Sequence, residues 1–492
     1  MVKSERDVRM EVFDSFKQVF ASAPIRLMSR TVSEMRARGY SDLASAIGDL
    51  DWRTVPADDP EDPNLRHDWQ NMLEAAFEHV DGWLNQLSPH PHGYNLDSIG
   101  FPAVTRAWGG LWSTQLGIDF ANEAHSPPEI MVFHGGNQAL QASLLGVSEA
   151  RRNRVGVGRP ATMLVPIPTF SCPMDQMALQ GMNVFFLPPG REDMDPSPED
   201  LDQVPDDVEI DGVYLMPINN PTGRTLPPEQ LRGFIDKVLH RWPHAGVVLD
   251  SVYVRLHPRY RDLLAWYDED PRYADAVLII DSLSKTHGVT GLRSGAILTR
   301  SSTLRDGIVR YAQNIMAGPS NAMQAVMMAL LAPYALGDQE VASHRIQLQL
   351  RIGRHLQRRR RLLMAAAVDR YKDLFDAQQP LLPDPGGFDW EGSRYADPRL
   401  SDRCRKIADE SGVSPPVAFY LETGIGGVPL EGFCNNPNLE RHGLVINADS
   451  RSPPRDHLRG GHARREGVRH RPAGADHPQR HRRDAREHAY SC

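Results

Sequence analysis

The sequence predicts an α/β protein with a large domain, in which a mostly parallel sheet is sandwiched by helices, and a smaller α+β domain. With 492 residues, 40% of them hydrophobic, the chain can bury a large core and form two or more domains. From residue 130 onward, short apolar runs alternate with amphipathic segments, a pattern typical of parallel sheets covered on both faces. Ligands of such sheets bind at the loops where strands end.

The first half of the chain divides into a helical leader and the large domain. Residues 1–95 predict the leader and the N-terminal part of the small domain, with helices near 5–21 and 66–87 on either side of the acidic loop VPADDPEDPN. Residues 96–335 predict the large domain. Its expected strands are 162–166, 183–187, 212–217, 246–249, 276–280 and 295–298. Its expected helices lie near 137–146, 171–180, 228–241, 302–314 and 320–332.

The remainder predicts the small domain and a tail. Residues 336–450 begin with a long helix over 338–372 between the domains, and VAFYLETGIGGVPLEGF (417–433) predicts a small-domain strand and turn. Residues 451–492 hold 11 arginines, 6 histidines and few large apolar residues, so we expect this tail to be disordered. An altered reading frame would explain its change in composition.

Composition and charge exclude several classes of protein. The N-terminus MVKSERDVRM lacks the apolar core of a signal peptide, and no apolar run is long enough to span a membrane. The four cysteines have no metal-binding or redox spacing, which favours a cytoplasmic protein without a metal site. Residues 1–450 hold 44 basic and 58 acidic residues, a net charge of −14, which argues against nucleic acid as a partner.

The clearest chemical signal is DSLSKTHGVTGLRSGAI (281–297), which follows an apolar run. Lys285 is one of only six lysines, and Ser282 and Arg293 place a hydroxyl and a fixed cation on either side of it. The glycines at 288, 291 and 295 predict tight turns and a close approach of the backbone to another group. An amine beside anion-binding groups is what a Schiff base with an aldehyde-bearing phosphate ester requires.

This stretch resembles the cofactor-lysine motif of the fold-type-I pyridoxal-phosphate enzymes, in the aminotransferase class I/II family. The resemblance implies that Lys285 carries pyridoxal 5'-phosphate as an aldimine, while Ser282 and Arg293 hold the cofactor phosphate. Upstream, HGGNQALQASLLG (134–146) sets Gly135, Gly136 and Asn137 at a helix start, where backbone N–H groups and the helix dipole bind phosphate.

Three further motifs follow in the family order. In PIPTFSCP, Phe170 matches the aromatic ring that stacks on the cofactor. In PINNPTGRTL, Asn220 matches the residue that donates to the phenolic oxygen of the cofactor, which Tyr253 would share. In VVLDSVYVRL, Asp250 ends an apolar strand, and the resemblance supplies the pyridine nitrogen as its partner.

The resemblance implies a homodimeric aminotransferase with shared active sites, acting on an amino acid and a 2-oxo acid. Lys285 would be the base at the substrate Cα, with Asp250 and Tyr253 also catalytic. β- or γ-elimination or replacement, with S-adenosylmethionine as one substrate, and decarboxylation stay open as alternatives. A transcription regulator is disfavoured, because residues 1–90 show acidic loops rather than a basic helix-turn-helix.

The substrate-binding residues are less clearly marked. Tyr94 resembles the tyrosine that reaches the cofactor phosphate of the neighbouring subunit, and Arg441 or Arg451 is a candidate for the substrate carboxylate. The segment GLVINADS (443–450) lacks the arginine that family members carry near this place. His287, two residues after the lysine, is either a proton relay or a buried, satisfied loop histidine.

Overall fold

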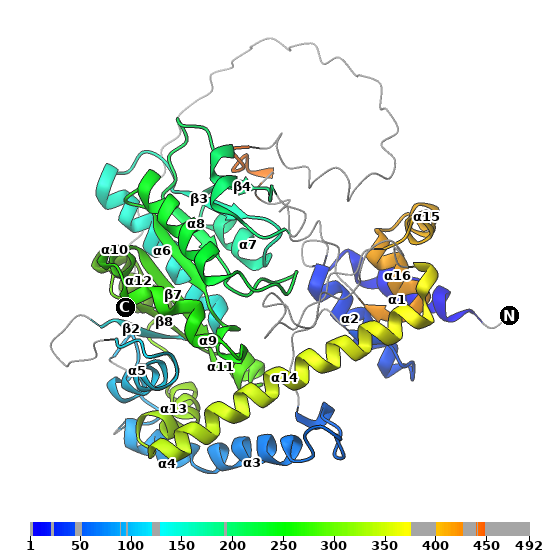
Figure 1. Ribbon diagram of the computed structural model, residues 1–492, viewed down its shortest axis with the longest axis horizontal. Coiled ribbons are helices and arrows are strands. Elements are labelled where there is room, and N and C mark those ends of the chain that lie inside the picture. Colours follow the sequence, from blue (N-terminus) through cyan, green and yellow to red (C-terminus); the bar gives the residue numbers. More distant parts are fainter. Residues whose placement is uncertain are drawn as a thin grey trace, which may run out of the picture. The chain divides into compact units, whose positions relative to one another are not determined.

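A seven-stranded sheet lies at the centre of the chain (Figure 1). The computed structural model describes residues 3–20, 24–44, 52–88, 90–94, 97–120, 128–190, 194–374, 400–426, 439 and 441–447. The strands are β2 (Ile130–His134), β3 (Thr162–Pro166), β4 (Asn183–Leu187), β5 (Gly212–Leu215), β6 (Gly246–Asp250), β7 (Val277–Ser282) and β8 (Ser294–Thr299). Their order across the sheet is β2-β8-β7-β6-β5-β3-β4.

Strand direction gathers the candidate site residues at one edge of the sheet. β8 runs antiparallel to both of its neighbours, β2 and β7, whereas the pairs from β7 to β4 are parallel. The carboxyl ends of β2, β5, β6 and β7 therefore meet at the edge where β8 begins. The predicted α/β fold with a mostly parallel sheet is confirmed.

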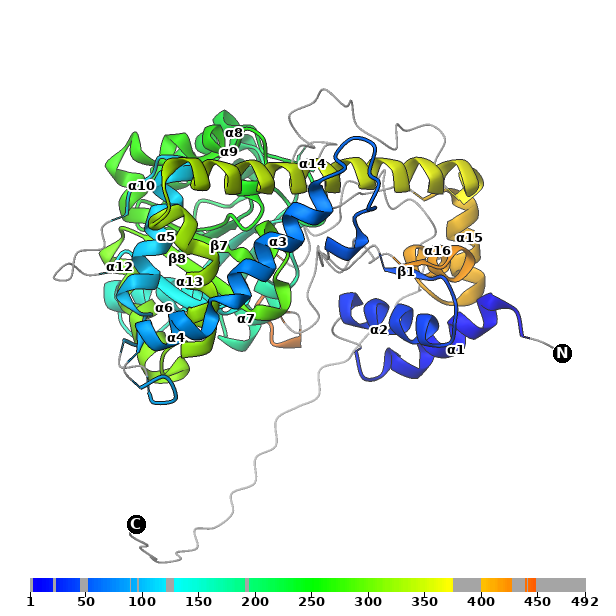
Figure 2. The same cartoon turned by 90° about the horizontal axis from the view of Figure 1, so that it is seen from below.

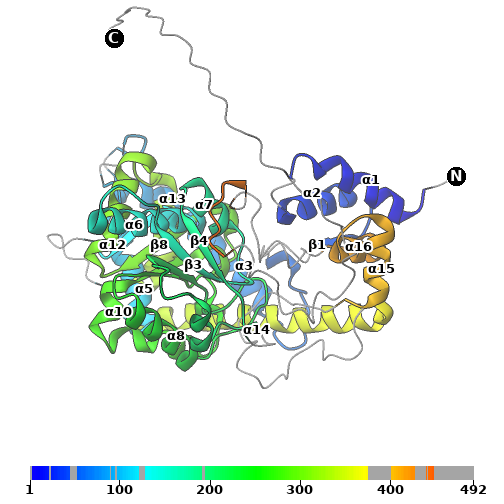
Figure 3. The same cartoon turned by 90° about the horizontal axis from the view of Figure 1, so that it is seen from above.

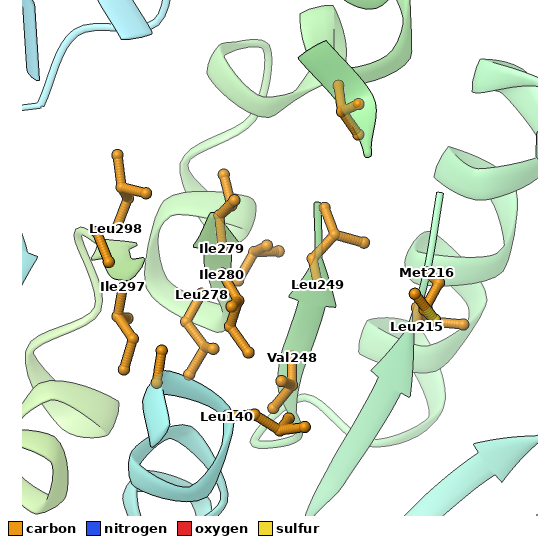
Figure 4. Packing of buried hydrophobic residues seen from close by; sticks show 14 of the residues in the cluster. Leu140, Leu215, Met216, Val248, Leu249, Leu278, Ile279, Ile280, Ile297 and Leu298 are labelled. Atoms are coloured by element: carbon orange, nitrogen blue, oxygen red, sulfur yellow. The ribbon is translucent and has the colours of Figure 1, made fainter. Parts of the chain in front are cut away.

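The strands form because their apolar side chains are buried on both faces of the sheet. Every residue of β3, β5, β6, β7 and β8 is buried. Such runs are typical of parallel sheets covered by helices. Figure 4 shows the apolar side chains of β5 to β8, with Leu140 from the neighbouring helix among them.

Helices flank the sheet. They are α5 (Pro102–Leu116), α6 (Gly136–Val155), α7 (Cys172–Leu179), α8 (Pro228–Arg241), α9 (Tyr260–Leu264), α10 (Pro271–Ala276), α11 (Leu283–Thr286), α12 (Ser302–Tyr311) and α13 (Asn321–Ala335). α6 contacts strands β2, β6, β7 and β8 and packs against α12, while α5 and α13 contact β2 and β8 respectively. No helix among the described residues is long and apolar enough to cross a membrane.

Two helices of the predicted leader pack on the large domain, and one of them also packs on the long helix α14 (Gln339–Arg370). α3 (Leu65–Glu78) and α4 (Val80–Leu87) contact α13, and α3 also lies beside α14 (Figure 2). Arg351 of α14 donates to Asp62 at 2.6 and 2.8 Å and to Asp68 at 2.6 Å. Ion pairs and apolar packing together thus hold the leader against α14.

A second group of helices has its own small apolar clusters. It contains α1 (Glu5–Lys17), α2 (Pro24–Ala37), α15 (Asp402–Ser411) and α16 (Pro415–Thr423), with a short parallel pair of β1 (Leu43–Ala44) and β9 (Ile425–Gly426) (Figure 3). Asp42 accepts hydrogen bonds from Arg9 and, at 2.8 Å, from the Tyr420 hydroxyl. We propose that this group is the core of the smaller domain.

Several predicted elements differ in the structure. The strand expected at the start of 417–433 is wrong, because α16 covers it: Pro415 opens the helix and Gly424 ends it in the left-handed conformation. An apolar run does not by itself distinguish a buried strand from a buried helix. The helix expected over 66–87 is two helices that meet at His79. Strand β2 and helices α2 and α5 were not among the predicted elements.

The end of the described chain lies against the large sheet. In the segment that begins GLVIN, Val445 forms an isolated parallel bridge with Val184 at the β4 edge of the large sheet. The Asn447 side chain bonds the backbone of Phe186 at 3.0 and 2.6 Å. The turn at 428–433, Arg451 and the tail 451–492 lie outside the described residues.

Candidate active site

Three chain segments meet at the carboxyl edge of the sheet and carry the predicted site residues. β6 ends at Asp250, β7 ends at Ser282, and the four-residue helix α11 that follows β7 carries Lys285. β2 leads into α6 through Gly135. β6 and β7 are parallel neighbours, and Lys285 is close enough to Asp250 to lower the pKa of this carboxyl. The structure therefore brings the lysine and the aspartate together.

Asp250 is a buried carboxyl group held by neutral donors. It is 6% exposed, and its Oδ2 accepts a hydrogen bond from the Tyr214 hydroxyl at 3.0 Å. Its Oδ1 accepts from the Val252 N–H at 3.4 Å. Burial raises the pKa of Asp250 to about 6, although the hydrogen bond from Tyr214 lowers it. A buried carboxylate in this setting favours a cationic partner.

A glycine cradle with a cation beside it lies at the start of α6. A Cβ on Gly135 would lie 2.7 Å from Nη2 of Arg293, and one on Gly295 would lie 2.6 Å from the carbonyl carbon of Gly135. The guanidinium is exposed and also donates to the Thr290 carbonyl at 2.8 Å. Backbone N–H groups at the start of a 20-residue helix, next to an arginine, form a site suited to a phosphate.

The glycines after Lys285 do different things. Gly288 has φ +71°, which requires a glycine at a turn. Gly295 permits the close approach to Gly135. Gly291 lies in the short 3-10 turn Thr290–Leu292, and an added Cβ there would meet nothing within 4 Å. Among these glycines the close approach to another backbone segment thus falls on Gly295.

The remaining predicted cofactor residues surround this edge. Ser282 caps α11 and donates its hydroxyl hydrogen to the Ser294 carbonyl oxygen at 2.5 Å. Asn220 and Tyr253 are buried, at 5% and 4% exposure, Phe170 is half-buried, and Asn137 is exposed in the first turn of α6. Their roles toward a cofactor stay predictions.

His287 is buried in the loop, which supports the interpretation as a satisfied structural histidine rather than a proton relay. It is 1% exposed, and burial, with Arg255 and Arg345 nearby, lowers its pKa well below the ordinary value. Its Nε2 lies 3.3 Å from the Gln349 amide nitrogen, and its Nδ1 lies 2.9 Å from the Thr286 hydroxyl. Its carbonyl accepts from the Trp69 indole at 3.0 Å. These bonds tie the lysine loop to α14 and to the leader.

The two predicted substrate residues do not join this cluster within the described chain. Tyr94 is 89% exposed, and Arg441 is exposed as well. Tyr94 was expected to act on a neighbouring subunit, which a single chain does not test. Both stay predictions.

Two residues of the site were missed from the sequence. Tyr214, in the middle of β5, bonds Asp250, and His134 receives the Ser320 N–H on Nε2 at 3.1 Å and contacts Gln138 through Nδ1 at 3.0 Å. A tyrosine inside a fully buried strand is a signal, because its hydroxyl needs a partner. The partner itself depends on strand order, which local sequence does not give.

Comparison with known proteins finds aminotransferases that resemble part of the chain. Aminotransferase class I and II matches residues 152–366. Histidinol-phosphate aminotransferase of Staphylococcus saprophyticus is 32% identical over 138 residues, 27% of this chain and 35% of that protein. LL-diaminopimelate aminotransferase of Dehalococcoides mccartyi is 23% identical over 323 residues, 64% of this chain and 71% of that protein. The chain thus matches about a third of the length of the first curated relatives, which are histidinol-phosphate aminotransferases.

Solved structures share the fold. Aspartate aminotransferase of Thermus thermophilus with maleate superposes with a TM-score of 0.60 at 16% identity, covering 90% of this chain and 98% of that chain. N-succinyldiaminopimelate aminotransferase of Mycobacterium tuberculosis gives 0.58 at 18% identity, covering 90% and 94%. No cluster of metal-ligating side chains occurs among the described residues. Residues 152–366 thus match the aminotransferase class I and II family, and the fold is that of aspartate aminotransferase.

Proposed function

We propose that this protein is a pyridoxal-phosphate-dependent aminotransferase that moves the amino group of an amino acid to a 2-oxo acid. The observation that carries the proposal is that Asp250 ends β6 and Lys285 lies three residues beyond the end of the neighbouring parallel strand β7, within electrostatic reach of Asp250. The family match and the glycine cradle at Gly135 support it.

The residues present fit the cofactor. The start of α6 at Gly135 and Gly136, with the Arg293 guanidinium beside Gly135, suits its phosphate, because backbone N–H groups at a helix start and a cation both favour an anion. The buried Asp250 suits its protonated ring nitrogen, because a cationic partner offsets the cost of burying the carboxylate. When bound, the cofactor would accept the electron pair left as a bond to the substrate Cα breaks.

The protein's own residues would supply positioning and proton transfer. The Lys285 amine would hold the cofactor covalently and, once displaced by the substrate amine, would take the proton from the substrate Cα. Tyr253 and Asn220, both buried at the same edge, would bond the phenolic oxygen. Phe170 would cover one face of the ring.

Transfer of a labelled amino group tests the reaction. Wild-type protein loaded with pyridoxal phosphate is mixed with ¹⁵N-labelled amino acids and a 2-oxo acid, and mass spectrometry follows the label. We expect ¹⁵N in the new amino acid. Release of labelled ammonia, of a leaving group or of carbon dioxide instead would contradict transamination and point to elimination, replacement or decarboxylation.

Borohydride reduction tests the lysine. Reduction should fix the cofactor on the peptide that contains Lys285, and Lys285→Ala should lose this label together with about 10²- to 10⁴-fold or more of the turnover. Lys406→Ala is the matched control, because the Lys406 side chain is 77% exposed on α15. Full activity in Lys285→Ala would exclude the proposed mechanism.

The homodimer with shared sites belongs to the same proposal. Tyr94 is the residue we assign to the partner's cofactor phosphate, and its 89% exposure leaves it accessible to a second subunit. Sedimentation should give twice the monomer mass. Mixing Tyr94→Phe with Lys285→Ala subunits should restore one intact site in each heterodimer, with Lys285 from one subunit and Tyr94 from the other, whereas no restored activity would contradict the shared site.

A further inference from the structure

Tyr214 makes a contact with Asp250 that the proposed reaction does not yet use. It lies in β5, is 1% exposed, and pairs in parallel register with Val248 of β6. Asp250 follows Val248 by two residues and so faces the same side of the sheet. The tyrosine ring is long enough to reach along the strands, and its hydroxyl donates to Asp250 Oδ2 at 3.0 Å.

The surroundings of Asp250 make this bond electrostatically important. After burial, the hydrogen bond from Tyr214 has the largest effect on the pKa of Asp250, ahead of the Val252 N–H. Asp281 on β7 raises this pKa and Lys285 lowers it. Cys172 of α7 lies near both Asp250 and Tyr214, and Tyr253 also lies near Tyr214.

The chemistry of a phenol suits the position. A lysine or arginine bound to Asp250 would compete for its charge with a cationic ring nitrogen, whereas a neutral hydroxyl leaves the full negative charge available. Burial and Asp250 raise the pKa of Tyr214 well above its usual value, so its proton stays on the phenol oxygen. The hydroxyl is therefore a donor at every working pH.

We propose that Tyr214 is a positioning residue that fixes the carboxylate of Asp250 and keeps it ionised for the ring nitrogen of the cofactor. This inference rests on the proposed function, since it concerns the same site. A merely structural role, in which the bond only satisfies a buried tyrosine, makes a different prediction, because it does not depend on whether the ligand carries a ring nitrogen.

The experiment compares two ligands on two variants. Dissociation constants of pyridoxal phosphate and of its 1-deaza analogue, which has carbon in place of the ring nitrogen, are measured by spectroscopic titration on wild type and Tyr214→Phe. We expect Tyr214→Phe to weaken pyridoxal phosphate about 10-fold, as for a hydrogen bond to a charged group, and to leave the deaza analogue within about 2-fold.

A matched control exists in the same chain. Tyr273 is also a buried tyrosine that donates to a carboxylate, Asp236, at 2.7 Å, on α10 and α8 away from the site. Tyr273→Phe should leave both affinities unchanged. A second measurement follows the affinity for pyridoxal phosphate as the pH is lowered. The midpoint of the loss of affinity in acid should rise by about one pH unit in Tyr214→Phe.

Each outcome decides the question. Equal losses of affinity for both ligands would overturn the positioning role while the proposed function stands. So would an unchanged affinity together with an unchanged midpoint of the loss of affinity in acid. Failure of the wild type to bind pyridoxal phosphate would overturn the proposed function itself. Should Tyr214→Phe not fold, 3-fluorotyrosine can replace Tyr214, because it is a stronger hydrogen-bond donor of nearly the same size. It should move the midpoint of the loss of affinity in acid to lower pH, and an unchanged midpoint would again overturn the positioning role.

Discussion

Gly295 decides, at the scale of a single residue, whether the phosphate cradle can form. An added Cβ would lie 2.6 Å from the Gly135 carbonyl carbon and 2.8 Å from the Gly136 nitrogen. These backbone atoms cannot move apart cheaply, because Gly295 is paired with Phe133 of β2 and Gly135 follows the last residue of that strand. Space at this one position therefore sets the shape of the proposed phosphate site.

We expect Gly295→Ala to weaken pyridoxal phosphate binding about 10- to 100-fold, since overpacking of this kind costs about 1–3 kcal/mol. Fluorescence titration of the cofactor-free protein measures this affinity. Gly291→Ala is the control in the same loop, where the new methyl group meets nothing within 4 Å. Equal affinities in the two variants would show that the close approach does not shape the site.

Asp250 should make the cofactor-free protein less stable as pH rises. Its pKa in the folded protein is about 6, raised by burial from 3.8. The folded state therefore holds this proton more tightly than the unfolded state, and stability falls between about pH 4 and pH 6. The difference corresponds to about 3 kcal/mol above that range.

Asp250→Asn removes this titration. In urea unfolding of cofactor-free protein, we expect the variant to exceed wild type by about 1–3 kcal/mol at about pH 8 and to match it within about 1 kcal/mol at about pH 4. Asp206→Asn, at a fully exposed carboxylate, should show no such difference. An Asp250→Asn variant with the pH dependence of wild type would contradict the raised pKa.

At the scale of elements, α14 binds the leader through Arg351. Hydrogen bonds from Arg351 lower the pKa of Asp62, so this ion pair stabilises the folded protein above the unfolded pKa near 3.8 and is lost as pH falls through the lower folded value. Arg351→Gln should cost about 1–2 kcal/mol at neutral pH and less in acid, measured by denaturant unfolding. An equal cost at about pH 3 and pH 7 would argue against this ion pair.

How far the sequence predicts the structure also depends on the element. Lys285 and Asp250 could be proposed from sequence because each stands in a contiguous motif at or just after the end of an apolar strand, and the structure places the two close together. α16 was mistaken for a strand because an apolar run satisfies either element in a buried setting. Tyr214 was missed because its partner comes from another strand, and only the order of strands in the sheet brings the two together.

At the scale of the whole molecule, the leader shares its core with the sheet. Trp69, Leu65 and Met72 of α3 belong to the same apolar cluster as strands β2 to β8. Trp69→Ala should therefore destabilise the large domain by about 3–5 kcal/mol, as expected for a fully buried aromatic residue. Phe77→Ala, 43% exposed on the same helix, should cost less than about 1 kcal/mol.

The measurement is urea unfolding followed by circular dichroism and by the absorbance of bound cofactor. A shared core predicts that both signals in Trp69→Ala shift to lower urea together. A variant in which only part of the helical signal shifts, while the cofactor signal keeps the wild-type midpoint, would show that α3 unfolds independently of the sheet.

The indole of Trp69, bonded to the His287 carbonyl two residues past the lysine, has a practical consequence for anyone who trims or recombines this protein. The segment that matches the family begins at residue 152, and every strand of the large sheet lies at or after Ile130. A shortened version that starts at Ile130 would keep the entire sheet, but the lysine loop would lose its hydrogen bond from Trp69. Chimeras with proteins of the same fold should accordingly exchange α3 and the lysine loop as one block.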